Sequence, residues 1–284
     1  MKCVVITGVS SGIGFCTADM LCEAGYKVYG SVRKIDDATK IAKKHGKLFK
    51  PLVFDVRDEN AIEKSVEFVK RDLSKNDNIV SLVNNSGIAL GGPFKHLSTD
   101  IFRKQLEVNV LGVVSVTRAF LELLGAFKGS KNQGKIIMIS SVSGRRAYPY
   151  MSPYAASKFA LEGMSDSLRR ELMMYGIDVI LVEPGPVKSE IWNKAPDKNN
   201  HPYINTDYKE SVETFYDQVV DKAQEPLPTE ILGNAIKDII ENPSPKTRYV
   251  FTKNKFKEYI LPGLLPDRTL DKLMASRLKI KKEQ

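Results

Sequence analysis

The sequence is poor in cysteine and has no long uninterrupted apolar run. Its three cysteines, Cys3, Cys16 and Cys22, are an odd number without CxxC spacing, which argues against both a disulfide framework and a zinc site. No stretch reaches the roughly 18 uncharged apolar residues that a membrane-spanning helix needs. No basic-then-apolar leader precedes the apolar run Cys3–Ile6, so no secretion signal is expected. These absences favour a cytoplasmic protein without a metal site.

The composition is that of a folded protein whose positive charge is concentrated at one end. With 284 residues, of which 42% are hydrophobic and 27% charged, the chain is not disordered in the main and suits one large domain. From Lys246 to the end, eleven Lys and Arg residues stand against four Asp and Glu, which accounts for seven of the nine net positive charges. This asymmetry indicates an ordinary body with a basic C-terminal extension.

Seven short apolar runs alternate with segments of helical periodicity. An i, i+3, i+4 pattern fills most of the intervals, and this alternation is typical of repeated βαβ units. We therefore predict an α/β fold, a doubly wound Rossmann-type parallel sheet of about seven strands with helices on both faces. The predicted strands are Cys3–Ile6, Tyr26–Val32, Leu52–Val56, Val80–Val83, Lys135–Ile139, Asp178–Val182 and Tyr249–Thr252.

No repeat, low-complexity stretch or Gly/Ser-rich linker divides the chain. We expect residues 1–252 to form a dinucleotide-binding catalytic domain, and residues 253–284 to be a basic extension of that domain. Residues 186–228 hold five prolines and few periodic stretches, and a long insertion after a late strand tends to lie over the ligand crevice. The insertion is thus a predicted substrate lid. Its aromatic residues either line an apolar lid or simply pack on the body: Trp192, Tyr203, Tyr208, Phe215 and Tyr216.

A glycine-rich turn, Thr7-Gly8-Val9-Ser10-Ser11-Gly12-Ile13-Gly14, follows the first predicted strand. Glycine permits a tight turn and a close approach of phosphate to the backbone, and the helix N-terminus that follows supplies N–H groups and partial positive charge. The spacing is GxxxGxG, which is neither the GxGxxG fingerprint nor a Walker motif. A plain strand-to-helix turn is the alternative to a pyrophosphate site. The predicted site comprises Gly8, Ser10, Ser11, Gly12, Ile13 and Gly14.

The second predicted strand ends at Val32-Arg33-Lys34, where a site for NAD usually has an acidic residue. A guanidinium can hold a 2′-phosphate through two hydrogen bonds, and no carboxylate is present there to repel the phosphate. We therefore predict NADP(H) as the cofactor, with Arg33 as its phosphate ligand. In the alternative interpretation Arg33 is a solvated loop charge, and Asp36 or Asp37 binds the ribose of NAD(H).

Tyr154 and Lys158 form a Tyr-x-x-x-Lys pair behind Ser152 and Pro153, a plausible N-cap and first helical residue. The pair therefore shares one helix face. A phenol needs about 4 kcal/mol to lower its pKa from about 10 to neutrality, and a cation about 4 Å away contributes about that much at an effective dielectric near 20. Lys158 is thus sufficient to make Tyr154 a working acid/base. An isolated pair of this kind is typically only a solvated helix face.

Ser141 stands thirteen residues before Tyr154, just past the strand predicted at Lys135–Ile139. Its hydroxyl could hold a substrate oxygen beside the phenol, and Ser140 would take this place if the register were off by one residue. With the glycine turn, Asn84-Asn85-Ser86-Gly87 and Asn109, these residues resemble the single-domain short-chain dehydrogenase/reductase family over about residues 2–252.

This resemblance implies a role for each matching residue. Tyr154 would exchange the proton with an alcohol or ketone oxygen, and Ser141 would orient that oxygen. Lys158 would lower the pKa of Tyr154 and bind the nicotinamide ribose. Asn109 would open its helix locally and hold a proton-relay water, and Asp55 would contact adenine. Further cofactor contacts are implied for Val56, Asn84, Gly87, Pro184, Gly185, Val187 and Ser189, where Ser189 replaces the usual threonine and Ser86 the usual alanine.

Some of these residue types also have an ordinary structural use, because Asn84, Asp55 and Asn109 could be turn or capping residues. Two rival functions use the same scaffold. A catalytically silent NADP-binding sensor would be expected to lose Tyr154 or Lys158, and both are present. An epimerase or dehydratase would keep the cofactor turn without net NADP turnover.

The run Ala155–Leu172 and the segment Val32-Arg33-Lys34 are similar to the hydroxysteroid and retinol dehydrogenase branch of the family. This similarity implies an apolar secondary alcohol or ketone, or a retinol- or aldehyde-type compound, as substrate. The family resemblance also implies a homo-oligomer, a dimer or a tetramer, that associates through the helix containing Tyr154.

Apolar residues of the basic extension fall at helical spacing among its Lys and Arg residues. Such a helix packs on its own body or a partner, or it lies on an anionic membrane as a peripheral contact. Nucleic acid is not an expected partner, because few aromatic residues are available to stack on bases. The apolar residues are Leu270, Leu273, Met274 and Leu278.

Overall fold

The computed structural model describes residues 1–187, 201–220 and 226–281. Seven strands form one parallel sheet in the order β3-β2-β1-β4-β5-β6-β7, which confirms the predicted doubly wound fold. The strands are β1 (Lys2–Ile6), β2 (Lys27–Val32), β3 (Phe49–Val53), β4 (Asn78–Asn84), β5 (Lys135–Ile139), β6 (Asp178–Pro184) and β7 (Arg248–Phe251).

The third strand differs most from its predicted bounds. It runs over Phe49–Val53 instead of Leu52–Val56, so Asp55 and Val56 follow the strand rather than end it. Pro51 lies inside this strand and is paired with Gly30 of β2. A proline is tolerated there because β3 is at the edge of the sheet and needs no second ladder of hydrogen bonds.

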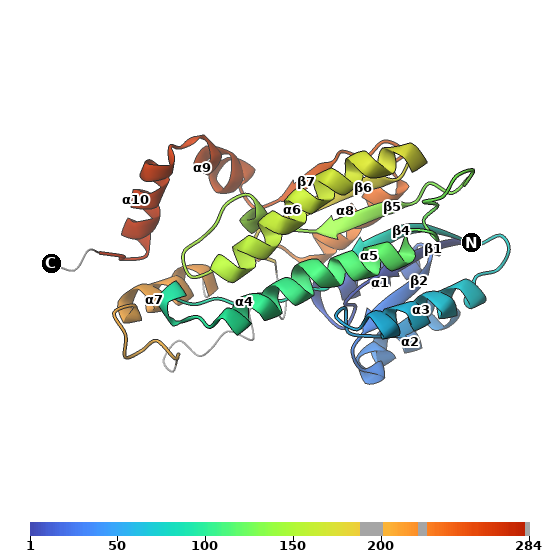
Figure 1. The fold of residues 1–284 in the computed structure, drawn as a ribbon, viewed down its shortest axis with the longest axis horizontal. Coiled ribbons are helices and arrows are strands. Elements are labelled where there is room, and N and C mark those ends of the chain that lie inside the picture. The colour runs from blue at the N-terminus through green and yellow to red at the C-terminus, as the bar shows by residue number, and fades with distance from the viewer. Residues whose placement is uncertain (188–200, 221–225, 282–284) are drawn as a thin grey trace.

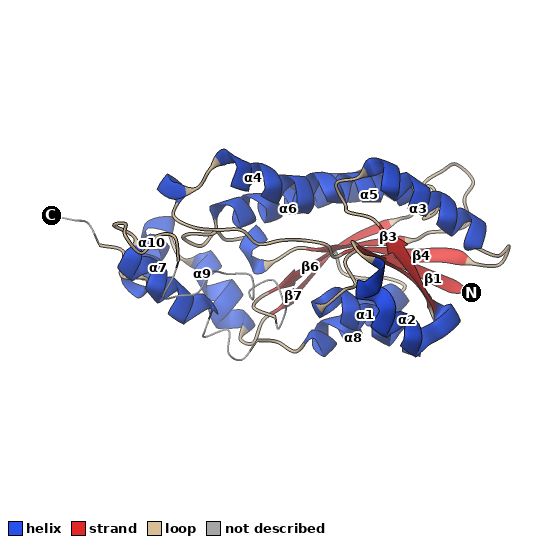
Figure 2. Cartoon of the chain, turned by 90° about the horizontal axis from the view of Figure 1, so that it is seen from below, coloured by secondary structure: helices blue, strands red, loops and turns tan. Residues whose placement is uncertain are grey.

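Helices cover both faces of the sheet, as Figure 2 shows. One apolar core lies between the sheet and α3, α5 and α6, and a second lies between the sheet and α1 and α8. Several helix ends are extended by single turns of different pitch. The α-helices of the two layers are α1 (Gly12–Glu23), α2 (Thr39–His45), α3 (Glu59–Asp72), α4 (Thr99–Leu106), α5 (Gly112–Phe120), α6 (Ser152–Leu172) and α8 (Thr229–Glu241). The 3₁₀ turns are Ile35–Ala38, Gly46–Leu48, Phe94–His96, Val142–Gly144 and Met173–Tyr175, and the π-turns are Glu107–Leu111, Tyr216–Val220 and Phe256–Ile260.

Three further helices lie off the carboxyl ends of the strands, at the end of the molecule toward which the strand arrows point (Figure 1). They are α7 (Lys209–Phe215), α9 (Leu261–Leu264) and α10 (Asp267–Arg277). In an open parallel α/β sheet, ligands bind outside this edge. No helix within the described ranges is long and apolar enough to span a bilayer.

Candidate active site

The glycine-rich turn joins β1 to α1 and is tied to the neighbouring strands. The Gly8 N–H donates to Ser31 Oγ over 3.0 Å, and Asn85 Nδ2 donates to the carbonyl oxygens of Thr7 and Gly8 over 2.8 Å each. Gly8 has a φ of +73°, which disfavours any residue with a Cβ. A Cβ on Gly14 would collide with the Gly8 carbonyl and the Asn85 amide. The turn therefore needs glycine at both positions.

The N-terminus of α1 opens onto this turn. The helix begins at Gly12, and the side chain of its N-cap residue Ser11 makes no capping hydrogen bond. The first N–H groups of a helix have no intrahelical partner and carry partial positive charge. Ser10 and Ser11 are exposed beside them, and Ile13 is half-buried. The turn consequently has the chemistry of a phosphate cradle.

The loops after β2 and β3 bring opposite charges together. Arg33 is exposed directly after β2. The Arg57 side chain donates two hydrogen bonds of 2.9 Å to the two carboxylate oxygens of Asp55. Arg57 and, more weakly, Arg33 lower the pKa of the Asp55 carboxyl. The carboxylate predicted to contact adenine is thus already bound by Arg57, a residue that sequence reasoning missed although it stands only two positions away.

Tyr154 and Lys158 lie in the first turns of α6 and are 9% and 7% exposed. The helix begins at Ser152 and has Met151 as its N-cap, one residue earlier than predicted. Lys158 Nζ donates to the Ile139 carbonyl over 2.7 Å and lies 5.7 Å from the centre of the Tyr154 ring. Burial lowers the pKa of Lys158 to about 8, and the nearby Glu162 carboxylate acts in the opposite direction.

Ser141 lies two residues after the end of β5, and its hydroxyl forms a hydrogen bond with the Tyr154 phenol. Burial raises the pKa of Tyr154, and the hydrogen bond with Ser141 lowers it by less. The direction of this pKa shift is opposite to the one predicted from Lys158, because desolvation of the buried phenol dominates. The Ser141 oxygen also accepts from Ser143 N over 3.1 Å and lies 3.5 Å from the Pro184 carbonyl.

Asn109 lies in the π-turn Glu107–Leu111 between α4 and α5, so the helix is locally widened where the resemblance implied it. Asn109 Oδ1 accepts from Ile88 N over 2.9 Å, and Nδ2 donates to Ile88 O and to Ser157 Oγ over 3.0 Å each. Ser157 Oγ in turn donates to the Tyr154 carbonyl over 2.7 Å. Sequence reasoning missed Ser157, although its position three residues after Tyr154 places it on the same helix face.

The remaining predicted cofactor residues lie in two places, at the end of β4 and at the end of β6. Asn84 is buried, and its Nδ2 donates to Thr117 Oγ1 over 2.8 Å, so this side chain ties β4 to α5. A Cβ on Gly87 would lie 3.4 Å from Asn109 Oδ1. Pro184 ends β6, and Gly185 N donates to the carbonyl of Phe251 over 2.8 Å. Val187 pairs with Leu227 in an isolated bridge, whereas Ser189 and Trp192 lie outside the described residues.

Aromatic rings of the insertion gather beside this site. Tyr150 lies edge-on to Tyr208 and Phe215, at centroid distances of 6.2 and 5.7 Å. Tyr216 stacks on His201, and Tyr203 is tilted against the same imidazole. The rings of the insertion therefore pack on one another and on the residues just before α6.

Comparisons with known proteins agree with this geometry. A model of the short chain dehydrogenase family matches residues 2–200. The chain is 43% identical over 280 residues, 98% of each chain, to an NADPH-dependent 3-dehydrocapnine reductase from Ornithobacterium rhinotracheale. It is 37% identical to a 3-ketodihydrosphingosine reductase from Bacteroides thetaiotaomicron, over 64% of this chain and 62% of that one. A short-chain dehydrogenase structure from Streptomyces avermitilis shares the fold, with a TM-score of 0.74, 24% identity and coverage of 98% and 95%.

Proposed function

Because this chain belongs to the short-chain dehydrogenase/reductase family, we propose that it is a ketone reductase in which Tyr154 is the acid/base. The chain is an oxidoreductase that uses NADPH, the cofactor for which its relative from Ornithobacterium rhinotracheale is named. One observation carries the assignment of Tyr154. Its phenol, bonded to Ser141, and the Lys158 ammonium are buried together on one face of α6, at the edge of the sheet that also holds the glycine-rich turn.

The residues present fit NADPH. The turn is built on Gly8 and Gly14, where a Cβ would collide with neighbouring protein atoms, and the N-terminus of α1 has no side-chain cap. Arg33 takes the 2′-phosphate, and the nearby Arg57 neutralises the Asp55 carboxylate. When bound, NADPH supplies the hydride that reduces the carbonyl carbon. The proposed binding residues are Gly8, Ser10, Ser11, Gly12, Ile13, Gly14, Arg33, Asp55, Val56, Asn84, Gly87, Tyr154, Lys158, Pro184, Gly185, Val187 and Ser189.

The proton comes from Tyr154. A raised pKa keeps this phenol protonated at neutral pH, which suits donation to a ketone oxygen and therefore the direction of reduction. Ser141 donates a hydrogen bond to the same oxygen and holds it beside the phenol. Lys158, with a pKa of about 8, is mostly protonated at pH 7, and its charge stabilises the phenolate left behind.

Asn109 positions the route by which the proton is replaced. Its amide is fixed by the backbone of Ile88 and by Ser157, which itself bonds to the Tyr154 carbonyl. Lys158 Nζ has three donors, and the Ile139 carbonyl takes one of them. The other donors are free to bind a ribose hydroxyl or a relay water.

The substrate is an apolar or amphiphilic ketone. Two relatives are named for reducing a 3-dehydro or 3-keto compound, and the aromatic rings at Tyr150, Tyr208 and Phe215 offer an apolar surface next to Tyr154. A sphingosine-type ketone, with a polar head and a long alkyl chain, fits this combination. Hydroxysteroid- and retinol-type substrates are the alternative to be tested beside it.

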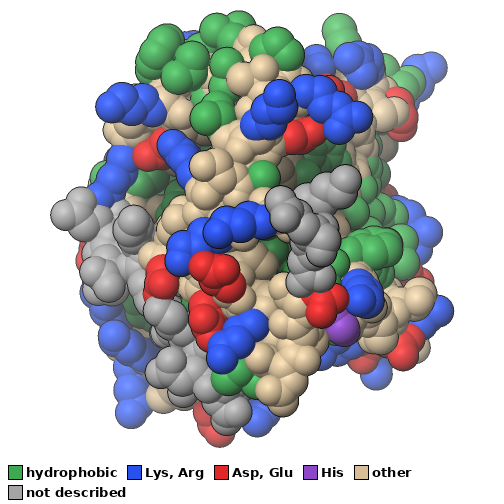
Figure 3. Space-filling model, turned by 90° about the vertical axis from the view of Figure 1, so that its left-hand side faces the viewer, with side chains coloured by type: hydrophobic (Ala, Val, Ile, Leu, Met, Phe, Trp, Pro, Cys, Tyr) green, Lys and Arg blue, Asp and Glu red, His purple; other side chains and the backbone are tan. Residues whose placement is uncertain are grey.

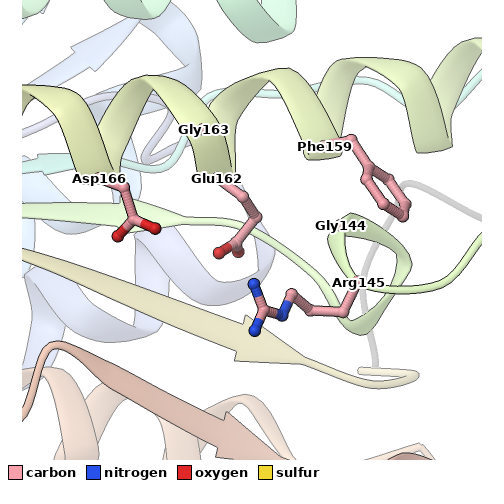
Figure 4. Close-up of a pocket in the computed structure, with 6 residues that line it drawn as sticks. All are labelled: Gly144, Arg145, Phe159, Glu162, Gly163 and Asp166. Carbon is pink, nitrogen blue, oxygen red and sulfur yellow. The ribbon is translucent and has the colours of Figure 1, made fainter. Parts of the chain in front are cut away.

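A homo-oligomer forms through the outer face of α5 and α6. Leu111, Val114 and Phe159 are 58%, 39% and 45% exposed, which is high for large apolar side chains. Next to Phe159 is a hollow of about 400 Å³ that contains none of the catalytic residues (Figure 4). Size-exclusion chromatography with light scattering tests this face, because Phe159→Glu would convert the oligomer into monomer. The hollow is lined by Gly144, Arg145, Phe159, Glu162, Gly163 and Asp166.

The C-terminal extension makes a peripheral contact with anionic lipid. Figure 3 looks onto the end of the molecule that carries α7, α9 and α10, where basic side chains lie among apolar ones. An exposed apolar surface rimmed by Lys and Arg binds anionic bilayers. Sedimentation with phosphatidylserine vesicles tests the contact, with phosphatidylcholine vesicles as control. The exposed apolar residues are Phe256, Ile260, Leu261 and Leu264.

The function is tested by following NADPH oxidation at 340 nm with the full-length protein. The substrates are 3-ketodihydrosphingosine, a steroid ketone, retinal and a short ketone, each with NADPH and with NADH. We expect NADPH-dependent reduction, with the long-chain ketone preferred. Absence of cofactor turnover with every carbonyl compound would contradict the proposal and favour an epimerase, a dehydratase or a sensor.

A further inference from the structure

Most residues of the described part of the C-terminal extension, residues 253–281, are exposed, six are half-buried, and Leu278 alone is buried. Neither the π-turn Phe256–Ile260 nor α9 nor α10 contributes a buried residue. Leu278, directly after α10, is only 6% exposed. Within residues 253–281, the described part of the extension, it is the one buried side chain. Leu278 is therefore the one buried apolar contact of the described extension, and polar contacts also join the extension to the body, among them a hydrogen bond of 2.8 Å from Arg146 Nη2 to the Tyr259 carbonyl.

The buried contact of Leu278 is with the apolar cluster that contains Tyr154. Leu278 packs in one apolar cluster with Met151, Tyr154 and Phe215. The cluster joins the start of α6, the end of α7 and the C-terminal extension, which are far apart in the sequence and lie off the carboxyl ends of the strands (Figure 1). A residue of the extension thus forms part of the apolar surface around the phenol.

Polar contacts with the insertion hold this leucine in place. Gln218 Nε2 donates to the Arg277 carbonyl over 2.6 Å, and Lys279 Nζ lies 3.1 Å from Glu210 Oε1 of α7. Lys279 has a φ of +54°, a left-handed conformation that few residues other than glycine adopt. The residues on both sides of Leu278 therefore contact the insertion, Arg277 through its carbonyl and Lys279 through its side chain.

We propose that Leu278 is a specificity-determining residue: it forms a wall of the substrate site and limits the width of the apolar group that can lie beside Tyr154. The proposal rests on the proposed function, since it takes the phenol as the place where the ketone oxygen binds. Straight alkyl chains pass this wall, and branched or cyclic groups collide with it.

The first test compares Leu278→Ala and Leu278→Trp with Leu273→Ala, which changes a leucine of α10 that is 48% exposed. The value of kcat/KM is measured with NADPH for a linear ketone, 2-octanone, and a bulky one, cyclohexyl methyl ketone. One methylene in an apolar pocket changes kcat/KM by on the order of tenfold or more. We expect Leu278→Ala to raise the bulky-to-linear ratio by about tenfold, Leu278→Trp to lower it, and Leu273→Ala to match the wild type.

A second measurement needs no turnover and so separates this proposal from the proposed function. A dansylated alkyl acid is titrated into each NADPH-bound variant, and its affinity is read from dansyl fluorescence. Because its dansyl group is a bulky ring system that the wall would exclude, we expect tighter binding to Leu278→Ala and weaker binding to Leu278→Trp, on the order of tenfold. Identical ratios and identical probe affinities in Leu278→Ala and Leu273→Ala would overturn the wall. If the wild type reduces no ketone but the Leu278 variants still change the probe affinity as expected, the proposed function is overturned and the role of Leu278 as a wall stands.

Discussion

Asn109 of the π-turn and Ser157 of α6 are joined by a hydrogen bond of 3.0 Å between Nδ2 and Oγ, and both are buried. Through this bond, the widened helix before α5 is tied to the helix that carries Tyr154. Ser157 Oγ in turn donates a hydrogen bond to the Tyr154 carbonyl. The position of the phenol thus depends on two polar side chains that touch neither the ring nor its oxygen.

Ser157→Ala should lower kcat by about tenfold and the free energy of unfolding by about 1 kcal/mol, because it removes one buried hydrogen-bonding group. The matched control is Ser165→Ala. Ser165 lies on the same helix, is equally buried and bonds to the Leu161 carbonyl over 2.7 Å. Ser165→Ala should lower the free energy of unfolding by a similar amount and leave kcat unchanged. Steady-state kinetics and urea denaturation of both variants distinguish a positioning role from a purely structural one, and equal kcat values would rule out positioning.

Arg33→Ala should weaken NADPH binding by 10- to 100-fold and leave NADH binding nearly unchanged. The range corresponds to loss of about 1.5–3 kcal/mol, the worth of a hydrogen bond to a charged group. Lys34→Ala is the control, since Lys34 is the next exposed cation along the loop. Both affinities are read from quenching of protein fluorescence. An equal loss for the two cofactors would show that Arg33 does not hold the 2′-phosphate.

Lys158 makes the stability of the fold depend on pH in the alkaline range. Its pKa is about 8 in the folded protein and 10.5 in its ordinary state, so the unfolded chain binds more protons between these values. The cost of burying the charge is present in full below pH 8 and disappears as pH rises to 10.5. The free energy of unfolding of the wild type relative to Lys158→Met should therefore rise by about 3 kcal/mol over this window. Urea titrations at pH 7.5 and 10 measure it, and a constant difference would contradict the low pKa.

Arg248 neutralises acidic groups buried behind α6. Its guanidinium lies 3.1 Å from Glu162, 2.8 Å from Asp166 and 3.3 Å from Glu183. Burial and the neighbouring Glu162 raise the pKa of Glu183. Arg248→Ala should destabilise the protein by about 3–5 kcal/mol at pH 8, because it removes the cation that lies against the buried carboxylates of Glu162 and Glu183. The loss should be smaller at pH 5, where Glu183 can bind a proton. Denaturation at the two pH values tests this sign, and Glu183→Gln in the Arg248→Ala background should restore part of the loss.

Local patterns predicted the parallel sheet, because each strand is a short apolar run. They also predicted that Ser141, Tyr154 and Lys158 lie together, because all three stand within twenty residues of the end of β5. The bounds of β5 were predicted without error. The bounds of β3 were not, because only the edge position of the strand explains how Pro51 is accommodated.

Contacts between distant segments were out of reach of the sequence. Leu278 reads as one apolar position of an amphipathic helix, and nothing local distinguishes it from Leu273, which is exposed. The pKa of Tyr154 was expected to fall, since the sequence supplies the cation but not the degree of burial. Tertiary packing decides the burial of Leu278 and the pKa of Tyr154, because desolvation and side-chain partners arise only when α6, the insertion and the extension meet.

The central claim is that the Tyr154 phenol delivers the proton. Tyr154→Phe removes the hydroxyl and keeps the ring that packs against Met151, Phe215 and Leu278. Its kcat for ketone reduction should fall by about 10²–10⁴-fold, the usual contribution of a general acid, while NADPH affinity stays within about twofold because the cofactor's phosphate contacts are intact. Turnover near the wild-type value, with the fold and NADPH binding intact, would contradict the account.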